Sequence, residues 1–284
     1  MTLIDVAAAR EAIAGIAVET PVLASEALGE QVGAEVVLKL ESLQVTGSFK
    51  VRGAANRMLA LPAEERARGV VACSSGNHGR AVAYVGQLLG VPTTVCVPEW
   101  VDPSKLAAIR RHGAETVLYG RTYDEAEARS LEIQRERGLT YVHPFDDPYV
   151  IAGQGTIGLE LLEQVLELDT VVVPLSGGGL ISGIAQALKS HEPGIRVVAV
   201  SAANARMVRD LVDDHVLVSE REIREAMVFA LVEHKLVVEG GGAVGIAAVL
   251  SGRLRGVGKR VAVVVSGGNV DAQVLMRVIP ETHQ

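Results

Sequence analysis

Residues 170–188 have the sequence TVVVPLSGGGLISGIAQAL, a stretch without any charged side chain. Its valine run, its three glycines and its apolar end predict a buried strand, a turn at Ser176–Leu180 and a helix. The stretch approaches the length of a membrane span, but Pro174, Gln186 and the glycines are unfavourable in a lipid-facing helix. We therefore expect a strand–turn–helix unit of an α/β protein, and no membrane partner.

The rest of the chain has the same rhythm of β-branched runs and helical stretches. We expect strands at 36–40, 70–73, 93–97, 115–118, 140–142, 170–175, 196–200 and 260–265, and helices at 53–61, 79–89, 105–112, 123–137, 155–165, 181–190, 220–232 and 242–251. This alternation predicts an α/β architecture of mostly parallel sheets covered by helices. Residues that carry chemistry are then expected just after the strands, because ligands bind at the carboxyl ends of parallel strands.

Length and composition limit the possible functions. The chain has 284 residues, enough for about two domains. A formal net charge of −7 and only 3% aromatic residues argue against a nucleic-acid partner, which needs basic patches and stacking rings. Cys73 and Cys96 each lie in an apolar run, which indicates buried reduced thiols, and Met1–Asp5 lacks the basic region of a signal peptide. We therefore expect a cytoplasmic protein.

Four loops next to predicted elements are rich in small residues: Thr46–Lys50, Ser74–Gly79, Ser176–Leu180 and Ser266–Asn269. Small residues let backbone N–H groups approach a ligand closely. The three glycines of Ser176–Leu180 before a helix are typical of a phosphate nest, although tight strand–helix packing explains them equally well. Ser74–Gly79 can likewise hold a carboxylate or simply cap a helix.

Lys50 follows a segment, Leu43–Phe49, that contains no charge. A desolvated lysine with a lowered pKa can form a Schiff base, whereas most lysines are surface groups. The combination of such a lysine with a phosphate nest, a carboxylate loop and a hydroxyl at a strand end is typical of a pyridoxal phosphate site.

The chain resembles the fold-type II pyridoxal phosphate enzymes, in the branch of the serine/threonine dehydratases and serine racemases. The matching segments occur in the family's order: Thr20-Pro21, Thr46–Ala54, Ser74–Gly79, Ser176–Leu180, Glu239–Ala247 and Ser266–Asp271. The resemblance implies a two-domain, tryptophan synthase β-like fold, with a large cofactor-binding domain at 1–50 and 145–284 and a small domain at 51–144. It also implies a homodimer, pyridoxal 5'-phosphate as cofactor and a small amino acid as substrate.

The same resemblance implies roles for individual residues. The catalytic residues would be Lys50, which forms a Schiff base with the cofactor and moves the Cα proton, and Ser75. The cofactor would be bound by Phe49, Lys50, Asn77, Gly177, Gly178, Gly179, Leu180 and Ser266. The substrate would be bound by Ser74, Ser75, Asn77 and His78. Because Ser266 is uncharged beside the pyridine nitrogen, the cofactor would be a weaker electron sink, which suits prompt elimination.

We expect a dehydratase, an ammonia-lyase that eliminates the β-hydroxyl of threonine, serine or a hydroxyectoine-derived amino acid and yields a 2-oxo acid and ammonia. Pro174–Leu180 and Glu239–Ile246 resemble the dehydratases of hydroxyectoine utilisation. Ser75 leaves an amino-acid racemase as an alternative, because a serine at this position can reprotonate Cα in the family's racemases. Two other classes stay open: a nicotinamide oxidoreductase, from the G-x-G-x-x-G pattern of Gly153–Gly158, and a non-catalytic metabolite-binding protein.

Two departures from the family follow the expected strand 196–200. Racemase-like relatives have metal-binding carboxylates where this chain has Ser201 and Met207, so we expect no metal there. Val208 is followed directly by Arg209, where the family has roughly thirty further residues that cover the active site. We interpret this junction as a place where residues are skipped rather than lost, which predicts that Val208 and Arg209 are too far apart for a peptide bond.

Overall fold

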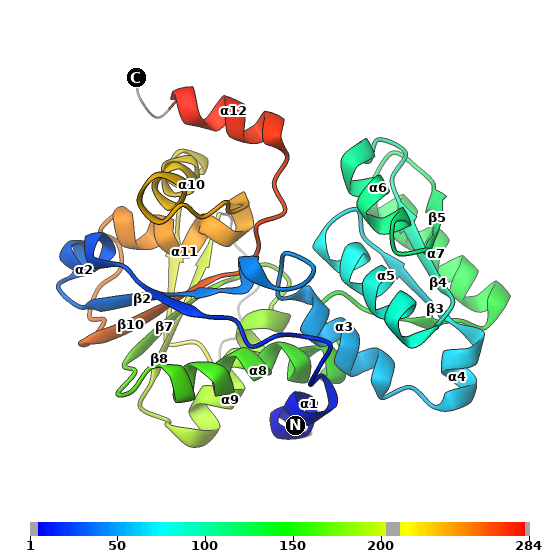
Figure 1. Cartoon of the computed structure of the whole chain (residues 1–284), viewed down its shortest axis with the longest axis horizontal. Coiled ribbons are helices and arrows are strands. Elements are labelled where there is room, and N and C mark those ends of the chain that lie inside the picture. The colour runs from blue at the N-terminus through cyan, green and yellow to red at the C-terminus, as the bar shows by residue number, and fades with distance from the viewer. Residues whose placement is uncertain (1–4, 203–210, 282–284) are drawn as a thin grey trace. The chain divides into compact units, whose positions relative to one another are not determined.

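The computed structural model of the chain describes residues 5–202 and 211–281 (Figure 1). The chain forms two compact units: unit 1 comprises residues 1–18 and 50–154, and unit 2 comprises residues 19–49 and 155–284. Each unit has the predicted α/β architecture, with a mostly parallel sheet between helices.

The boundaries of the units differ from those of the expected domains, because residues 1–18, Lys50 and residues 145–154 group with the smaller unit. Helix α1 (Val6–Ala12) packs on α3 (Lys50–Leu59). The first turns of α8 (Pro148–Gln164) also contact α3, where the Asn56 side chain donates to the carbonyl of Tyr149 at 2.7 Å. These contacts hold both segments to helix α3.

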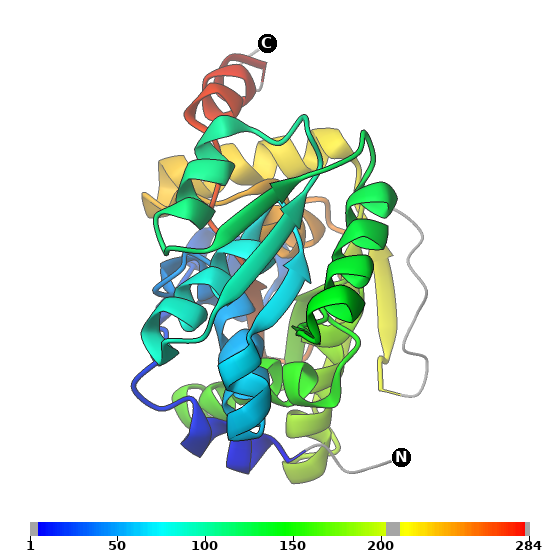
Figure 2. The same cartoon turned by 90° about the vertical axis from the view of Figure 1, so that its right-hand side faces the viewer.

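Unit 1 contains a four-stranded parallel sheet in the order β5-β4-β3-β6 (Figure 2). Its strands are β3 (Val70–Cys73), β4 (Thr93–Val97), β5 (Glu115–Leu118) and β6 (Thr140–Tyr141), and its other helices are α4 (Ala63–Arg68), α5 (Asn77–Leu89), α6 (Pro103–Arg110) and α7 (Tyr123–Arg137). On one face, Val70 and Ala72 pack against Val82 of α5. On the other face, Val71 packs against Ile133 of α7. Burial on both faces explains why β3 has no alternation of polar and apolar residues.

The two cysteines are buried and free, as predicted. Cys73 on β3 is in register with Cys96 on β4. Burial raises the pKa of Cys73 to about 12 and that of Cys96 to about 11. Because the thiolate is the reactive form, both side chains are chemically inert parts of the sheet.

Unit 2 contains a six-stranded sheet in the order β1-β2-β10-β7-β8-β9, in which only β1 is antiparallel to its neighbour. The strands are β1 (Val22–Ala24), β2 (Glu35–Leu40), β7 (Thr170–Pro174), β8 (Arg196–Ser201), β9 (Asp214–Leu217) and β10 (Arg260–Val265). The helices, besides the end of α8 and the short η1 (Glu41–Leu43), are α2 (Glu26–Val32), α9 (Gly179–His191), α10 (Glu220–His234), α11 (Gly240–Leu250) and α12 (Ala272–Glu281).

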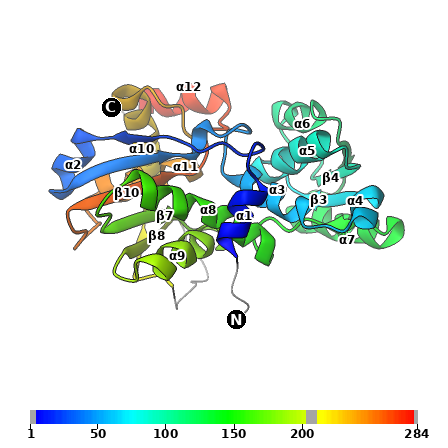
Figure 3. The same cartoon turned by 60° about the horizontal axis from the view of Figure 1, so that its bottom comes forward.

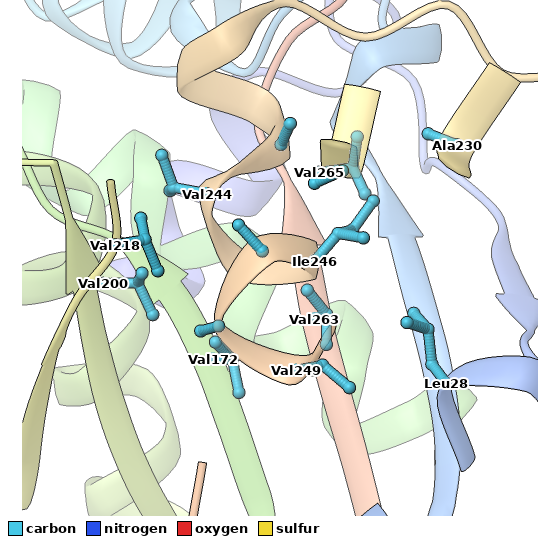
Figure 4. Close-up of a cluster of buried hydrophobic side chains, with 14 of the residues drawn as sticks. Leu28, Val172, Val200, Val218, Ala230, Val244, Ile246, Val249, Val263 and Val265 are labelled. Atoms are coloured by element: carbon cyan, nitrogen blue, oxygen red, sulfur yellow. The ribbon is translucent and has the colours of Figure 1, made fainter. Parts of the chain in front are cut away.

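The faces of this sheet are covered by different helices. Helices α10 and α11 cover one face and α9 covers the other (Figure 1, Figure 3). In Figure 4, Ile246 of α11 points to Val263 and Val265 of β10, within a cluster that also includes Leu28. The intervening residue Val264 faces the opposite side. The two buried faces explain the unbroken valine run of β10.

All eight expected strands and all eight expected helices are present; β3, β4, β5, β10 and α7 have the expected ends, and the ends of the others are shifted. The segment 170–188 forms β7, a turn and the start of α9, and among the residues that the structure describes no helix is long and apolar enough to cross a membrane. The Gly153–Gly158 pattern lies inside helix α8. A dinucleotide-binding pattern must follow a strand and open a helix, so the nicotinamide interpretation is wrong.

A charged side chain is fully buried where β2 ends. Lys39 has no exposed surface, and its Nζ donates to Glu160 Oε2 at 2.5 Å, to Gln164 Oε1 at 2.7 Å and to the carbonyl of Thr20 at 2.6 Å. A buried lysine is tolerated only when its donors are paired. This cluster therefore ties the end of β2 to helix α8 and to the segment before β1.

We expect Lys39→Met to lower the free energy of unfolding by about 3–5 kcal/mol, because it leaves Glu160 buried without its cation. The double variant Lys39→Met, Glu160→Met should recover most of this loss. The matched control is Lys189→Met, whose partner Asp213 has a side chain that is 40% exposed; its loss should be at most about 1 kcal/mol. Urea unfolding measures all three, and equal losses for Lys39→Met and the control would contradict the expectation.

Candidate functional site

Two of the predicted loops meet at the carboxyl edge of the sheet in unit 2. Strands β7 and β10 are neighbouring and parallel, so the turns that follow them open at the same edge. Ser176–Leu180 follows β7, and Ser266–Asn269 follows β10. This edge therefore combines the glycine turn with the hydroxyl that the sequence places after the last strand.

The glycine turn is built to accept an anion. Gly178 is the N-cap of α9, has a φ of +91° and makes no side-chain capping bond. The first N–H groups of a helix have no acceptor within the helix, and the helix dipole adds positive charge there. Gly177 is exposed, whereas Gly179 and Leu180 are buried. The N-terminus of this 13-residue helix can thus bind a phosphate group through backbone amides.

Ser266 lies directly after β10 and is 5% exposed. Its hydroxyl donates to the carbonyl of Gly241 at 3.3 Å, and its own carbonyl accepts from the Phe49 N–H at 3.2 Å. The ring of Phe49 packs against the α9 side of the core. A neutral hydroxyl and an aromatic ring at one edge suit a flat heteroaromatic ligand whose nitrogen needs a partner without charge.

The segment before Lys50 is fastened to the same edge. Gly268 N–H donates to the carbonyl of Gly47, and the Asn269 side chain donates to the carbonyl of Thr46, each at 2.9 Å. Gly47 has a φ of +75°, and a Cβ there would clash with the Asn269 side chain. The glycine is therefore required for this close approach.

In unit 1, Lys50 is the first residue of α3 and is half-buried. Its Nζ donates to the carbonyl of Pro144 at 2.6 Å. Pro144 follows β6, which is parallel to β3, so this segment and the Ser74–Asn77 loop leave the sheet at the same edge. Sequence reasoning missed Pro144, because its contribution is a backbone carbonyl and no side-chain signal marks it.

His78 is 3% exposed, and its Nε2 bonds to the carbonyl of Val142 at 2.8 Å. Since a carbonyl only accepts, Nε2 carries the proton. Burial, and then the positive charge of Lys50, lower the pKa of His78 to about 3, so the ring is neutral at physiological pH. Its side chain is occupied by the protein, which leaves its backbone N–H for the expected substrate contact.

Ser74, Ser75 and Asn77 are half-buried, and helix α5 begins at Asn77, two residues before the expected start. The N-cap is Gly76, whose N–H donates to Ser74 Oγ at 3.2 Å, and no side chain caps the helix. The structure therefore does not support the interpretation that Ser75 or Asn77 caps this helix with its side chain. The first N–H groups of a helix suit an anion such as a carboxylate, so this start of α5 is a candidate site for one.

Ser201, where we expect no metal, has a side chain that is hydrogen-bonded to a histidine. Ser201 Oγ and His215 Nε2 are 2.9 Å apart. Within residues 5–202 and 211–281, no group of three or more His, Cys, Asp or Glu side chains could hold a metal ion. Met207 and the Val208–Arg209 junction lie outside the described residues, so both expectations about them stay predictions.

Comparison with known proteins assigns the chain to a family. The sequence profile described as "Pyridoxal-phosphate dependent enzyme" matches residues 13–211. An L-threonine ammonia-lyase of Thermotoga maritima is 41% identical, over 98% of this chain and 78% of that protein. A catabolic L-threonine dehydratase of Escherichia coli K12 is 39% identical, over 94% of this chain and 92% of that protein. Among solved structures, maize serine racemase has a TM-score of 0.89 and 35% identity, over 98% of each chain.

This chain is shorter internally than its relatives. The alignment with the Thermotoga maritima protein spans 314 positions, whereas this chain has 284 residues. At least 30 aligned positions of that relative therefore have no counterpart here. This number is similar to the roughly thirty residues expected between Val208 and Arg209, and their place in the sequence stays a prediction.

We expect Gly178→Ala to weaken binding of pyridoxal phosphate to the apo protein by about 5–30-fold, because left-handed backbone costs a residue with a Cβ about 1–2 kcal/mol. The matched control is Gly194→Ala, since a Cβ at Gly194 meets no atom within 4 Å and its φ is ordinary. Fluorescence titration of the apo proteins measures both affinities. Equal affinities for the two variants would contradict a phosphate site at this turn.

Proposed function

The chain belongs to the pyridoxal-phosphate-dependent enzymes, and from this premise we propose that it is a dehydratase of threonine and serine. It removes the β-hydroxyl of the amino acid and releases a 2-oxo acid and ammonia. The observation that carries this proposal is the 41% identity to an L-threonine ammonia-lyase over 98% of the chain, together with Lys50 at the start of α3. A non-catalytic role is disfavoured because Lys50, Asn77 and Ser266 are all retained.

The donor groups of each unit fit pyridoxal phosphate. Unit 1 offers the Lys50 amine for a Schiff base and Asn77 for the phenolic oxygen. Unit 2 offers the amides of Gly177, Gly178, Gly179 and Leu180 for the phosphate, the Ser266 hydroxyl for the ring nitrogen and the Phe49 ring for packing. The uncapped start of α9 is the structural feature that supports the phosphate assignment.

When bound, pyridoxal phosphate withdraws electrons from the Cα atom of the amino acid. Lys50 Nζ then acts as the base that takes the Cα proton, a step typically worth about 10²–10⁴-fold. The start of α5, with Ser74, Ser75 and Asn77, orients the substrate carboxylate through neutral donors. Ser266 gives the ring nitrogen a hydrogen-bond partner that does not hold it protonated, which favours elimination over long-lived carbanion chemistry.

Two finer assignments belong to this proposal. The turn Pro174–Leu180 and the Glu239–Ile246 segment favour a catabolic enzyme that also accepts hydroxyectoine-derived hydroxy-amino acids. Racemisation is the second candidate activity, supported by Ser75 and by the 35% identity to maize serine racemase. A serine hydroxyl placed to return a proton to the other face of Cα would produce it.

We expect Lys50→Ala to abolish 2-oxo acid release and leave the fold intact, because Lys50 both anchors the cofactor and moves the proton. The assay uses wild type and variant with threonine, serine and hydroxyectoine-derived amino acids, and chiral analysis of recovered substrate detects racemisation. Borohydride should bleach the yellow wild-type protein and leave no covalent cofactor on the variant. The matched control is Lys105→Ala on exposed α6, which should keep full turnover. Lys50→Ala turnover within tenfold of wild type would refute the assignment.

We also propose a homodimer, on the ground of family resemblance, and a cytoplasmic location, which is supported by the two free, buried cysteines. Sedimentation velocity at micromolar concentration should give twice the 29.9 kDa mass of the chain. A monomer under these conditions would contradict the proposed assembly and leave the proposed chemistry untouched.

A further inference from the structure

The turn after β6 lies beside the reacting amine. The carbonyl of Pro144 accepts from Lys50 Nζ at 2.6 Å. His143 and Phe145 flank Pro144 in the sequence, and the Lys50 charge acts on the His143 ring. Neither has a part in the mechanism above.

His143 fixes the shape of this turn. Its Nδ1 accepts from the backbone N–H of Asp146 at 2.7 Å and from that of Phe145 at 3.3 Å. A ring nitrogen that accepts cannot carry a proton, and burial lowers the pKa of His143. The neutral ring thus holds the backbone on both sides of the Phe145 side chain.

The Phe145 ring is placed by the same histidine. The two rings are edge-to-face, with centroids 4.7 Å apart and an interplanar angle of 85°. Phe145 is nevertheless 37% exposed. An aromatic ring that is held in place and still presents apolar surface is available to contact a small apolar group.

We propose that Phe145 is a specificity-determining residue, whose ring contacts the β-substituent of the substrate and favours threonine, with its methyl group, over serine. This inference rests on the proposed function. The ring offers no hydrogen bond to a hydroxyl, so it discriminates by apolar contact alone. One methyl group in an apolar pocket is worth about 10–200-fold in kcat/KM, and a partly exposed ring belongs at the lower end of that range.

The test is the ratio of kcat/KM for threonine to that for serine in Phe145→Asn and Phe145→Leu. We expect the ratio to fall by about tenfold in Phe145→Asn, which replaces the apolar ring by a polar amide, and by less than threefold in Phe145→Leu. The matched control is Tyr119→Asn, an exposed aromatic residue of unit 1 that follows β5, at the other end of the strand order. Its ratio should equal that of wild type.

A binding measurement tests the contact between Phe145 and the β-substituent without the elimination reaction. L-2-aminobutyrate and L-alanine differ by the same methyl group as threonine and serine, and neither has a hydroxyl to lose. The ratio of their dissociation constants for the holoenzyme should shift as the kcat/KM ratio does in Phe145→Asn. A variant that merely disturbs the turn would weaken both ligands equally. If Phe145→Asn does not fold by circular dichroism, Phe145→Ala takes its place with the same expected shift.

The possible failures are distinct. Wild-type protein that releases no 2-oxo acid from either substrate would overturn the proposed function and this inference with it. Wild-type and variant proteins that both release 2-oxo acid with equal threonine-to-serine ratios would overturn the role of Phe145 and leave the dehydratase assignment intact.

Discussion

Parallel strands have one geometric property on which the candidate site residues of each unit depend: their carboxyl ends lie at a common edge of the sheet. In unit 2, β7 and β10 bring the turns at 176–180 and 266–269 together. In unit 1, β3 and β6 bring Ser74–Asn77 beside the segment that follows β6. The helices that return from these edges, α5 and α9, begin there, and the first N–H groups of a helix suit an anion without any basic side chain.

Close approach of the backbone at these edges requires small residues. Gly47 and Gly178 both have positive φ angles, a conformation that glycine adopts without strain. A Cβ at Gly79 would meet the carbonyl of Ser74, and one at Gly242 would meet that of Gly267. The glycines of the motifs therefore shape the edges, and this role is compatible with the proposed phosphate binding at the turn 176–180.

The sequence predicts most of the fold because the central strands are buried on both faces, and their unbroken valine runs are unmistakable. The missed strands lack that signal: β1 has three residues, and β9 begins with Asp214 and His215. The missed helices α1, α2 and α4 have six or seven residues each, too few for a clear period, and the ten-residue α12 is not predicted either. Within the site, motifs locate Lys50 and the glycine turn. The carbonyl of Pro144 carries no side-chain signal, and the burial of the His78 ring depends on packing that the local sequence does not encode.

Two basic side chains at the edge of unit 1, Lys50 and His78, have different hydrogen-bond partners and different proposed roles. Lys50 and His78 are close enough for the lysine charge to lower the pKa of the histidine. Both donate to the segment after β6, Lys50 to the carbonyl of Pro144 and His78 to that of Val142. Because His78 is neutral and its Nε2 proton is engaged, it neither competes for the substrate proton nor adds a cation beside the carboxylate loop. In the proposed mechanism the substrate carboxylate is held by amides and hydroxyls whose charge does not change near neutral pH. The proposal thereby separates substrate binding from proton transfer, which it assigns to the Lys50 amine.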